Sequence, residues 1–414
     1  MKPIELAKKI KEASHILAHL STEKKNSVLN TLEGLISKKR EYLFAENRKD
    51  IEEAERAGLQ KSLIERLKVD EKVIKEMQAS IRDVIVLPDP VEEMARLWKR
   101  PNGLLVGKMR IPIGVILVIY ESRPNVTVDA FSLCLKSGNS VILKGGSEAC
   151  YSNAALYSLI KESLRQENIS EEIARLVETG DRAYIYELLK QDEYIDLIIP
   201  RGGEALIRSV VEESSIPVLK HYKGVCHIYV DEWADIDLAH KICLNAKAQK
   251  PATCNAMETL LVHESVAKNF LPEMARIFGN SGVTLRGCSK TTDILKDISE
   301  ASEFDWYEEY LDLVLSVKIV KDMDEAINHI RKYGSDHTEA IITKNYNNAW
   351  RFLRELNSSL VLVNASTRLN DGYQLGLGAE MGISTTKLHA FGPMGLEELT
   401  VTKFVAFGDG QVRE

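Results

Sequence analysis

The sequence predicts an α/β protein with two doubly wound domains and a small β element. Three observations lead to that prediction. Short apolar runs alternate with helical patterns from residue 114 to residue 363, the first 100 residues show helical periodicity alone, and two β-like segments stand outside the alternation. Parallel strands need crossover connections of helical length, so the alternation indicates two parallel sheets.

Length and composition fit a protein of this kind. The 414 residues, 44% of them hydrophobic, give a soft prior of two or three domains. A net charge of −7 argues against a nucleic-acid or anionic-membrane surface. The strongest apolar run, residues 114–120, is far shorter than the roughly 18 residues that suggest a membrane span. The first residues show no apolar secretory stretch, so we expect a cytoplasmic protein without nucleic-acid or membrane partners.

The N-terminal 100 residues are expected to form amphipathic helices. Apolar side chains recur at helical spacing through residues 4–20 and again through 28–36, among Lys and Glu. Ser21 marks a break between these two stretches, and a Pro-rich turn at 83–90 ends the region.

Two sets of strands follow. The first set is expected at 114–119, 140–143, 174–178, 195–199 and 217–219, with helices at 127–136, 148–164, 182–189 and 204–211. The second set is expected at 226–230, 257–262, 283–286, 311–319, 339–343 and 359–363, with helices at 235–248, 264–277, 322–332 and 345–356. The β-like segments 103–111 and 399–410 could pair with each other within the chain or across a subunit interface.

One of the six cysteines is a candidate nucleophile. No CxxC pair is present, so we expect free thiols and no metal site. Cys254 sits between a helix and a strand, bracketed by small residues that leave room for a substrate carbonyl. A loop thiol of this kind can be wet enough to ionise, and the thiolate is the nucleophile. The alternative is a buried structural cysteine, which fits Cys134 and Cys243 on their predicted helices.

Two glycine pairs follow strands and open helices. The first is in residues 141–150, where Lys144, Gly145 and Gly146 precede Ser147 and Glu148; the second is Gly202-Gly203 after Arg201. Glycines let a ligand approach the backbone, and the carboxyl ends of parallel strands bind nucleotides in open α/β sheets. The alternative is a tight turn that needs glycine, but two such turns in one sheet favour a nucleotide.

Two further segments carry candidate polar groups. Arg123 follows the first sheet strand and can hold a carboxylate or phosphate. Asn125 could donate to a developing oxyanion or cap the helix that starts there. Glu380, in the glycine-rich stretch 375–385, could accept from ribose hydroxyls; the alternative is a flexible surface loop.

Together these residues resemble the aldehyde dehydrogenase superfamily, and within it the branch that reduces an acyl phosphate of glutamate. The stretches that carry the resemblance are 121–130, 135–149, 199–207, 221–231, 250–263, 369–385 and 388–400. The resemblance implies a cofactor-binding domain of residues 1–224 and 364–397 and a catalytic domain of residues 225–363. It also implies a β flap for oligomerisation, formed by residues 101–112 and 398–414.

The resemblance also implies roles for residues. Cys254 would be the nucleophile and Asn125 an oxyanion donor, and the substrate would be bound by Ser122, Arg123, Arg201 and His221. The adenosine side of the cofactor would lie by Lys144, Gly145, Gly146, Ser147 and Glu148, its pyrophosphate by Gly202 and Gly203, and its nicotinamide ribose by Glu380. Phe391 and Tyr373 depart from the family pattern, which usually has arginine and glycine there.

The expected function is NADPH-dependent reduction of L-glutamyl 5-phosphate to L-glutamate 5-semialdehyde in proline biosynthesis, through a cysteine thioester. A homodimer or homotetramer and functional coupling to glutamate kinase are expected as partners. Residues 219–228 contain no carboxylate where hydrolytic relatives carry a water-activating glutamate, which suits a thioester that must not hydrolyse. The alternatives are an acyl-CoA reductase of the same superfamily, a cysteine hydrolase or acyltransferase, and a scaffold without activity.

Overall fold

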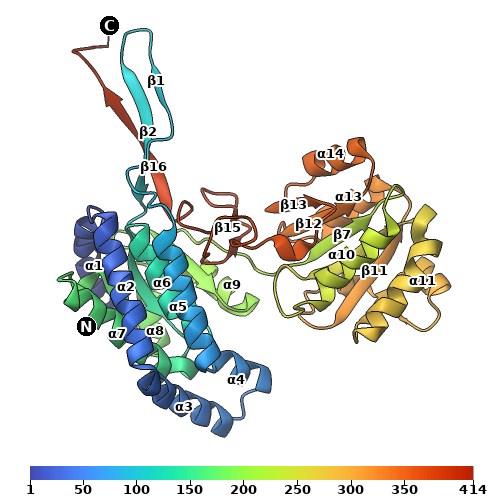
Figure 1. Cartoon of the computed structure of the whole chain (residues 1–414), viewed down its shortest axis with the longest axis horizontal. Coiled ribbons are helices and arrows are strands. Elements are labelled where there is room, and N and C mark those ends of the chain that lie inside the picture. Colours follow the sequence, from blue (N-terminus) through green and yellow to red (C-terminus); the bar gives the residue numbers. More distant parts are fainter. Residues whose placement is uncertain (414) are drawn as a thin grey trace.

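The computed structural model describes residues 1–413. Figure 1 shows two α/β bodies and a β ribbon that projects away from them. Five helices lead the first body: α1 (Pro3–Leu17), α2 (Thr22–Lys38), α3 (Arg40–Arg56), α4 (Lys61–Leu67) and α5 (Glu71–Val86). The Ser21 hydroxyl accepts from the Lys24 amide and caps α2, which confirms the break. The turn predicted at 83–90 starts later, because α5 continues to Val86, two residues before the first proline.

The first sheet has four parallel strands in the order β5-β4-β3-β6. Its strands and helices are β3 (Val115–Tyr120), α6 (Asn125–Lys136), β4 (Ser140–Lys144), α7 (Cys150–Gln166), β5 (Ala174–Leu176), α8 (Arg182–Leu188), β6 (Leu197–Arg201) and α9 (Glu204–Glu213). Strand order reverses between β3 and β6, so the turns after these strands form the switch point where ligands bind in open sheets. The strand predicted at 217–219 is wrong, because only a single bridge joins Ile198 and Val218.

The second sheet has seven parallel strands in the order β10-β9-β11-β8-β7-β12-β13. The strands are β7 (Cys226–Val230), β8 (Met257–His263), β9 (Thr284–Gly287), β10 (Ser299–Glu300), β11 (Val314–Val320), β12 (Thr338–Ile342) and β13 (Leu360–Val363). The helices are α10 (Ile236–Ala248), α11 (Glu264–Asn280), α12 (Ser289–Ile294), α13 (Met323–Tyr333) and α14 (Tyr346–Glu355). The strand predicted from 311 starts only at Val314, because Leu311 has a left-handed backbone with φ 54°. With both sheets parallel, the predicted doubly wound α/β class is confirmed.

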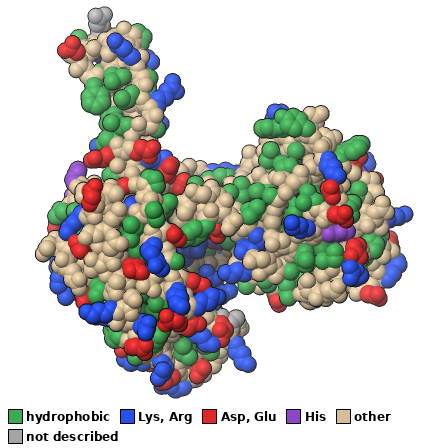
Figure 2. Space-filling view, viewed as in Figure 1, with side chains coloured by type: hydrophobic (Ala, Val, Ile, Leu, Met, Phe, Trp, Pro, Cys, Tyr) green, Lys and Arg blue, Asp and Glu red, His purple; other side chains and the backbone are tan. Residues whose placement is uncertain are grey.

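The two β-like segments pair with each other in one chain. β2 (Leu105–Pro112) runs antiparallel to β16 (Thr400–Phe407) over eight residue pairs, and β1 (Leu97–Lys99) adds a third strand. The predicted flap left out β1. Phe404 packs edge-on against Trp98, with the ring centroids 6.5 Å apart, and it is still largely exposed. Figure 2 shows further hydrophobic side chains on the surface of this ribbon.

The chain returns to the first body before it enters the ribbon. β14 (Ile383–Ser384) and β15 (Gly392–Pro393) form a short antiparallel pair, and the Thr385 amide donates to the Lys220 carbonyl. Met381, Met394 and Leu399 are buried in the same apolar core as β3 and β4. In the described part of the chain, no helix combines the length and apolar character that crossing a membrane requires.

Candidate active site

Cys254 lies on the turn that connects α10 to β8, at the amino ends of the strands of the second sheet. Its carbonyl oxygen accepts a hydrogen bond from the Cys226 thiol, with sulfur and oxygen 3.1 Å apart. The backbone at Gly224 passes against the same peptide, since a Cβ there would lie 1.9 Å from the Cys254 oxygen. The start of β7 therefore fixes the main chain of the predicted nucleophile.

The Cys254 thiol is less ready to ionise than the sequence suggests. The residue is partly exposed, yet burial of the sulfur raises its pKa to about 11. Arg201 lowers the pKa, whereas the carboxylates of Glu309 and Glu380 raise it. The partial exposure agrees with the expected loop position, whereas the raised pKa reflects segments distant in sequence that fold over the turn.

This environment makes a prediction for chemical labelling. The thiolate is the reactive form, and a raised pKa means that thiolate accumulates only as the pH rises toward about 11. The iodoacetamide labelling rate of Cys254, followed by peptide mass spectrometry, is expected to keep rising through about pH 10. Glutathione labelled in the same buffers is the control. A plateau for Cys254 near neutral pH would contradict the raised pKa.

Two arginines lie near enough to the thiol to interact with it electrostatically. Burial lowers the pKa of Arg123, and the charges of Arg201 and Arg66 lower it further, whereas Cys254 raises it. Within residues 1–413, no carboxylate lies within 4.0 Å of the guanidinium groups of Arg123 and Arg201. In Figure 2, Lys and Arg side chains gather around the hollow between the two α/β bodies. A protein with net charge −7 thus concentrates positive charge where an anionic substrate would bind.

Arg201 is positioned by the returning segment of the chain. A Cβ on Gly382 would lie 1.9 Å from an Nη atom of Arg201, and Gly382 has φ 122°, so glycine is required there. The guanidinium of Arg201, the last residue of β6, therefore packs directly against the backbone of Gly382. Arg123 follows β3 and Arg201 ends β6, the two strands of the switch point.

Ser122 and Glu148 contact each other. The amide and the hydroxyl of Ser122 both donate to the same Glu148 oxygen at 2.6 Å. Ser122 has a left-handed backbone, with φ 34°, which turns its amide toward the start of α7. Ser122, predicted to bind substrate, is thus hydrogen-bonded to Glu148, predicted to bind the cofactor. Both roles stay predictions.

Asn125 is the first residue of α6, and the N-cap position belongs to Pro124. The capping alternative for Asn125 is therefore wrong. Its amide nitrogen donates to Asp129 at 3.0 Å, and Asp129 also accepts from the Ser80 hydroxyl. A side-chain amide has two N–H groups, so one remains for an oxyanion.

Lys144 fits a nucleotide phosphate. Its ammonium donates to the Gly145 carbonyl at 2.5 Å, and no carboxylate of residues 1–413 forms an ion pair with it. Burial lowers its pKa, and Glu148 raises it. Gly145 and Gly146 form the turn from β4 into the short 3₁₀ helix η1 (Ser147–Ala149). A free cation beside a glycine turn suits the phosphate of a nucleotide.

The second glycine turn fits a phosphate less well. The Gly203 amide donates to a Glu121 carboxylate oxygen at 2.9 Å. The N-terminus of α9 thus already binds an anionic group, and a pyrophosphate there would meet the Glu121 charge. Lys144 is the better-supported phosphate contact, and the role of Gly202 and Gly203 stays a prediction.

His221 and Glu380 have shifted protonation equilibria. Burial lowers the pKa of His221 to about 4, and Arg201 lowers it further, so the imidazole is neutral at neutral pH. It offers a substrate anion a hydrogen bond but no charge.

Burial raises the pKa of Glu380 to about 7, Asp371 raises it further, and Arg201 lowers it. One Glu380 oxygen accepts from the Gly372 amide at 2.8 Å, which leaves the other for a ligand.

Four residues of this site escaped the sequence analysis: Gly224, Cys226, Glu309 and Arg368. Glu309 accepts from the Gly224 amide at 2.9 Å, and burial raises its pKa. It brings a carboxylate to the segment 219–228, which has none of its own. The only sequence signal for Gly224 and Cys226 was their place near the start of a predicted strand: Gly224 lies just before it, and Cys226 is its first residue.

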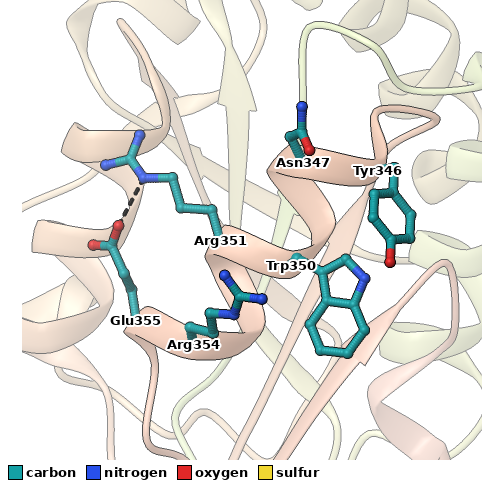
Figure 3. A pocket seen from close by; sticks show the side chains of 6 residues that line it. All are labelled: Tyr346, Asn347, Trp350, Arg351, Arg354 and Glu355. Carbon is teal, nitrogen blue, oxygen red and sulfur yellow. Dashed lines mark hydrogen bonds and ion pairs between the residues drawn. The ribbon is translucent and has the colours of Figure 1, made fainter.

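A surface hollow on α14 lies apart from this cluster. It is lined by side chains that all come from this helix, as Figure 3 shows: Tyr346, Asn347, Trp350, Arg351, Arg354 and Glu355. None of the predicted site residues lies there.

Comparison with known proteins assigns the chain and its fold to a family. The family model described as "Aldehyde dehydrogenase family" matches residues 4–294. A gamma-glutamyl phosphate reductase from Thermodesulfovibrio yellowstonii is 56% identical over 408 residues, covering 99% of this chain and 98% of the relative. One from Desulfatibacillum aliphaticivorans is 56% identical over 410 residues, with the same shares covered. The crystal structure of a gamma-glutamyl phosphate reductase from Thermotoga maritima superposes with a TM-score of 0.98, at 46% identity and full coverage of both chains.

The chain therefore belongs to the aldehyde dehydrogenase family of oxidoreductases. Within it, the full-length relatives and the matching solved structure place the chain among the gamma-glutamyl phosphate reductases. The resemblance seen in the sequence is confirmed.

Proposed function

We propose that the chain reduces L-glutamyl 5-phosphate to L-glutamate 5-semialdehyde with NADPH, releasing phosphate, as a step of proline biosynthesis. Membership among the gamma-glutamyl phosphate reductases supports the substrate and the product. The observation that carries the proposal is the position of Cys254 among Arg123, Arg201 and Arg368. A nucleophile surrounded by cations suits an acyl phosphate, which is an electrophile with an anionic leaving group.

The first chemical step follows from these positions. The Cys254 thiolate attacks the γ-carbonyl carbon, the carbon–oxygen bond to phosphate breaks, and phosphate leaves with the electron pair. The product on the enzyme is a thioester. The free N–H of Asn125 and the backbone N–H of Cys254 would hold the oxyanion, and one such donor contributes roughly 3–4 kcal/mol to transition-state binding.

A nicotinamide cofactor completes the reaction, because when bound it supplies the hydride that reduces the thioester to the aldehyde. Lys144 and the turn Gly145–Ser147, together with Glu148, would hold its adenosine end, and the unpaired ammonium of Lys144 favours a phosphorylated ribose, hence NADPH. Glu380 would hold the nicotinamide ribose through its free oxygen. Gly202 and Gly203 would lie near the pyrophosphate, beside the Glu121 carboxylate.

The proposal extends to the oligomeric state of the enzyme and to its coupling with the enzyme that makes its substrate. A homodimer or homotetramer is supported by the exposed Leu97, Phe404 and Phe407 on the ribbon, whose outer strand β16 has one unpaired edge. Acyl phosphates hydrolyse readily, so functional coupling to glutamate kinase in the cytoplasm would limit loss of substrate.

The proposal is tested by NADPH oxidation with glutamate kinase, ATP and glutamate, which generate the substrate in place. We expect a fall in absorbance that needs all three components. Oxidation with acyl-CoA thioesters alone would favour an acyl-CoA reductase. No absorbance change with either substrate, together with acyl hydrolysis, would favour a cysteine hydrolase. In the reverse direction, NADP reduction by the semialdehyde is expected to need inorganic phosphate.

A further inference from the structure

Arg368 spans the turn that carries Cys254. It lies on the 3₁₀ helix η4 (Thr367–Leu369), which follows β13. Its Nε donates to the side-chain oxygen of Gln249 at 3.0 Å, and one Nη donates to the Thr253 hydroxyl at 2.9 Å. Gln249 ends α10 and Thr253 directly precedes Cys254. A single planar guanidinium therefore joins the start of the turn to the residue beside the nucleophile.

The same segment holds the other neighbour of Cys254. The side-chain amide of Asn255 donates to the Asn370 carbonyl at 2.9 Å. Asn370 is fully buried, and its own amide donates to the Thr338 hydroxyl at 2.8 Å at the start of β12. Residues 368–370 thus form hydrogen bonds to the residues on both sides of Cys254. Asn370 in turn binds Thr338, at the start of β12 in the second sheet.

Arg368 carries its positive charge beside the turn of the thiol, through its hydrogen bond to the neighbouring Thr253. Arg368 is half-buried, and burial lowers its pKa, whereas the charges of Cys254 and Asp371 raise it. Within residues 1–413, no carboxylate pairs with Arg368 at ion-pair distance. An arginine stays protonated even when half-buried, so its positive charge is available to a thiolate at Cys254.

We propose that Arg368 is a positioning residue for the nucleophile: it fixes the 249–254 turn through Gln249 and Thr253 and stabilises the thiolate of Cys254 by its charge. The effect on turnover rests on the proposed function. The effect on the thiol does not, because thiol labelling needs no substrate.

The test combines four variants with labelling of Cys254 by iodoacetamide. Arg368→Gln removes the charge and the planar fork, and Arg368→Lys keeps only the charge. Thr253→Val keeps Arg368 and removes the hydroxyl beside Cys254, which accepts from Arg368 and also bonds to the Lys250 carbonyl and the Asn255 side chain. Arg354→Gln is the matched control, because Arg354 is an exposed arginine on α14 that stacks on Trp350, with 5.4 Å from the guanidinium carbon to the ring centre (Figure 3).

We expect Arg368→Gln to lower the labelling rate roughly tenfold at each pH from about 8 to 10, because below the pKa the rate follows the thiolate fraction. Arg368→Lys is expected to lie between Arg368→Gln and the unchanged protein. Thr253→Val and Arg368→Gln are both expected to lower kcat roughly 10- to 100-fold through loss of orientation, with KM for NADPH unchanged. Arg354→Gln is expected to leave all these values unchanged.

Unchanged labelling in a folded Arg368→Gln variant would overturn the proposal, whatever its kcat. Should Arg368→Gln fail to fold, unchanged kcat in folded Arg368→Lys and Thr253→Val would overturn it equally. If the unchanged protein shows no reductase activity but Arg368→Gln still slows labelling, the proposed function fails while the role of Arg368 in holding the thiolate stands.

Discussion

Replacing Cys254 with alanine is expected to lower kcat for reduction of the acyl phosphate by roughly 10⁴-fold or more, with the fold retained. Loss of the nucleophile in a covalent mechanism removes the step itself, and comparable replacements cost this much elsewhere. The side chain is partly exposed and its carbonyl keeps the contacts with Gly224 and Cys226, so alanine should leave the turn in place. NADPH oxidation in the coupled assay measures the loss, and circular dichroism checks the fold.

Cys288→Ser is the matched control for this variant. Cys288 likewise lies between a helix and a strand of the second body, at the N-cap of α12 after β9, where its sulfur lies 3.3 Å from the Thr291 hydroxyl, and nothing in the proposed mechanism uses it. We expect this variant to keep the full rate. A Cys254→Ala protein that still reduces the substrate at a rate close to the unchanged protein would refute the thioester.

Gly224→Ala should give the second-largest loss, although Gly224 has no side chain to contribute. A Cβ at this position would lie 1.9 Å from the oxygen and 2.7 Å from the carbonyl carbon of Cys254. Backbone must shift to relieve such contacts, and the peptide that shifts carries the nucleophile. A displacement of about 1 Å lowers kcat roughly 100-fold, and overpacking costs about 1–3 kcal/mol of unfolding free energy. Steady-state kinetics and urea denaturation measure the two effects.

Gly180→Ala provides the comparison. Gly180 also lies outside the helices and strands, and a Cβ there meets nothing within 4 Å. It should therefore behave as the unchanged protein in both measurements. Equal kcat for Gly224→Ala and Gly180→Ala would show that the close approach of Gly224 to Cys254 does not position the nucleophile.

The residues that the sequence analysis identified lie in local patterns. Arg123 comes shortly after one apolar strand, and Lys144 and Arg201 end two others, so their places at the sheet edge follow from the alternation of strands and helices. Cys254 stood out because its neighbours are small and its segment is not an apolar stripe. These features need no knowledge of long-range contacts.

The residues that the sequence analysis missed act through long-range contacts. Glu309 reaches Gly224 across 85 positions, and Arg368 reaches Thr253 across 115. No local pattern indicates such pairs, because each depends on how the strands are ordered in the second sheet. The same holds for the pKa of Cys254, which depends on burial by segments distant in sequence.

The strands show the same difference between local patterns, which the sequence reveals, and long-range contacts, which it does not. The pairing of β2 with β16 was one of two open possibilities, because alternation predicts that a segment forms a strand but not its partner. β1 is three residues long and carries Lys99 beside Trp98, and so short a segment shows no recognisable strand pattern. The start of β11 was misplaced because Leu311 adopts a left-handed backbone that its residue type does not suggest.

Mass spectrometry of the peptide that contains Cys254 would detect the proposed thioester itself. The protein would be mixed with glutamate kinase, ATP and glutamate, without reduced cofactor, and quenched in acid. We expect one glutamyl group on Cys254, joined as a thioester, which disappears when NADPH is added before the quench. Unmodified Cys254, or a glutamyl group on another residue, in a preparation that forms the semialdehyde once NADPH is present would contradict it.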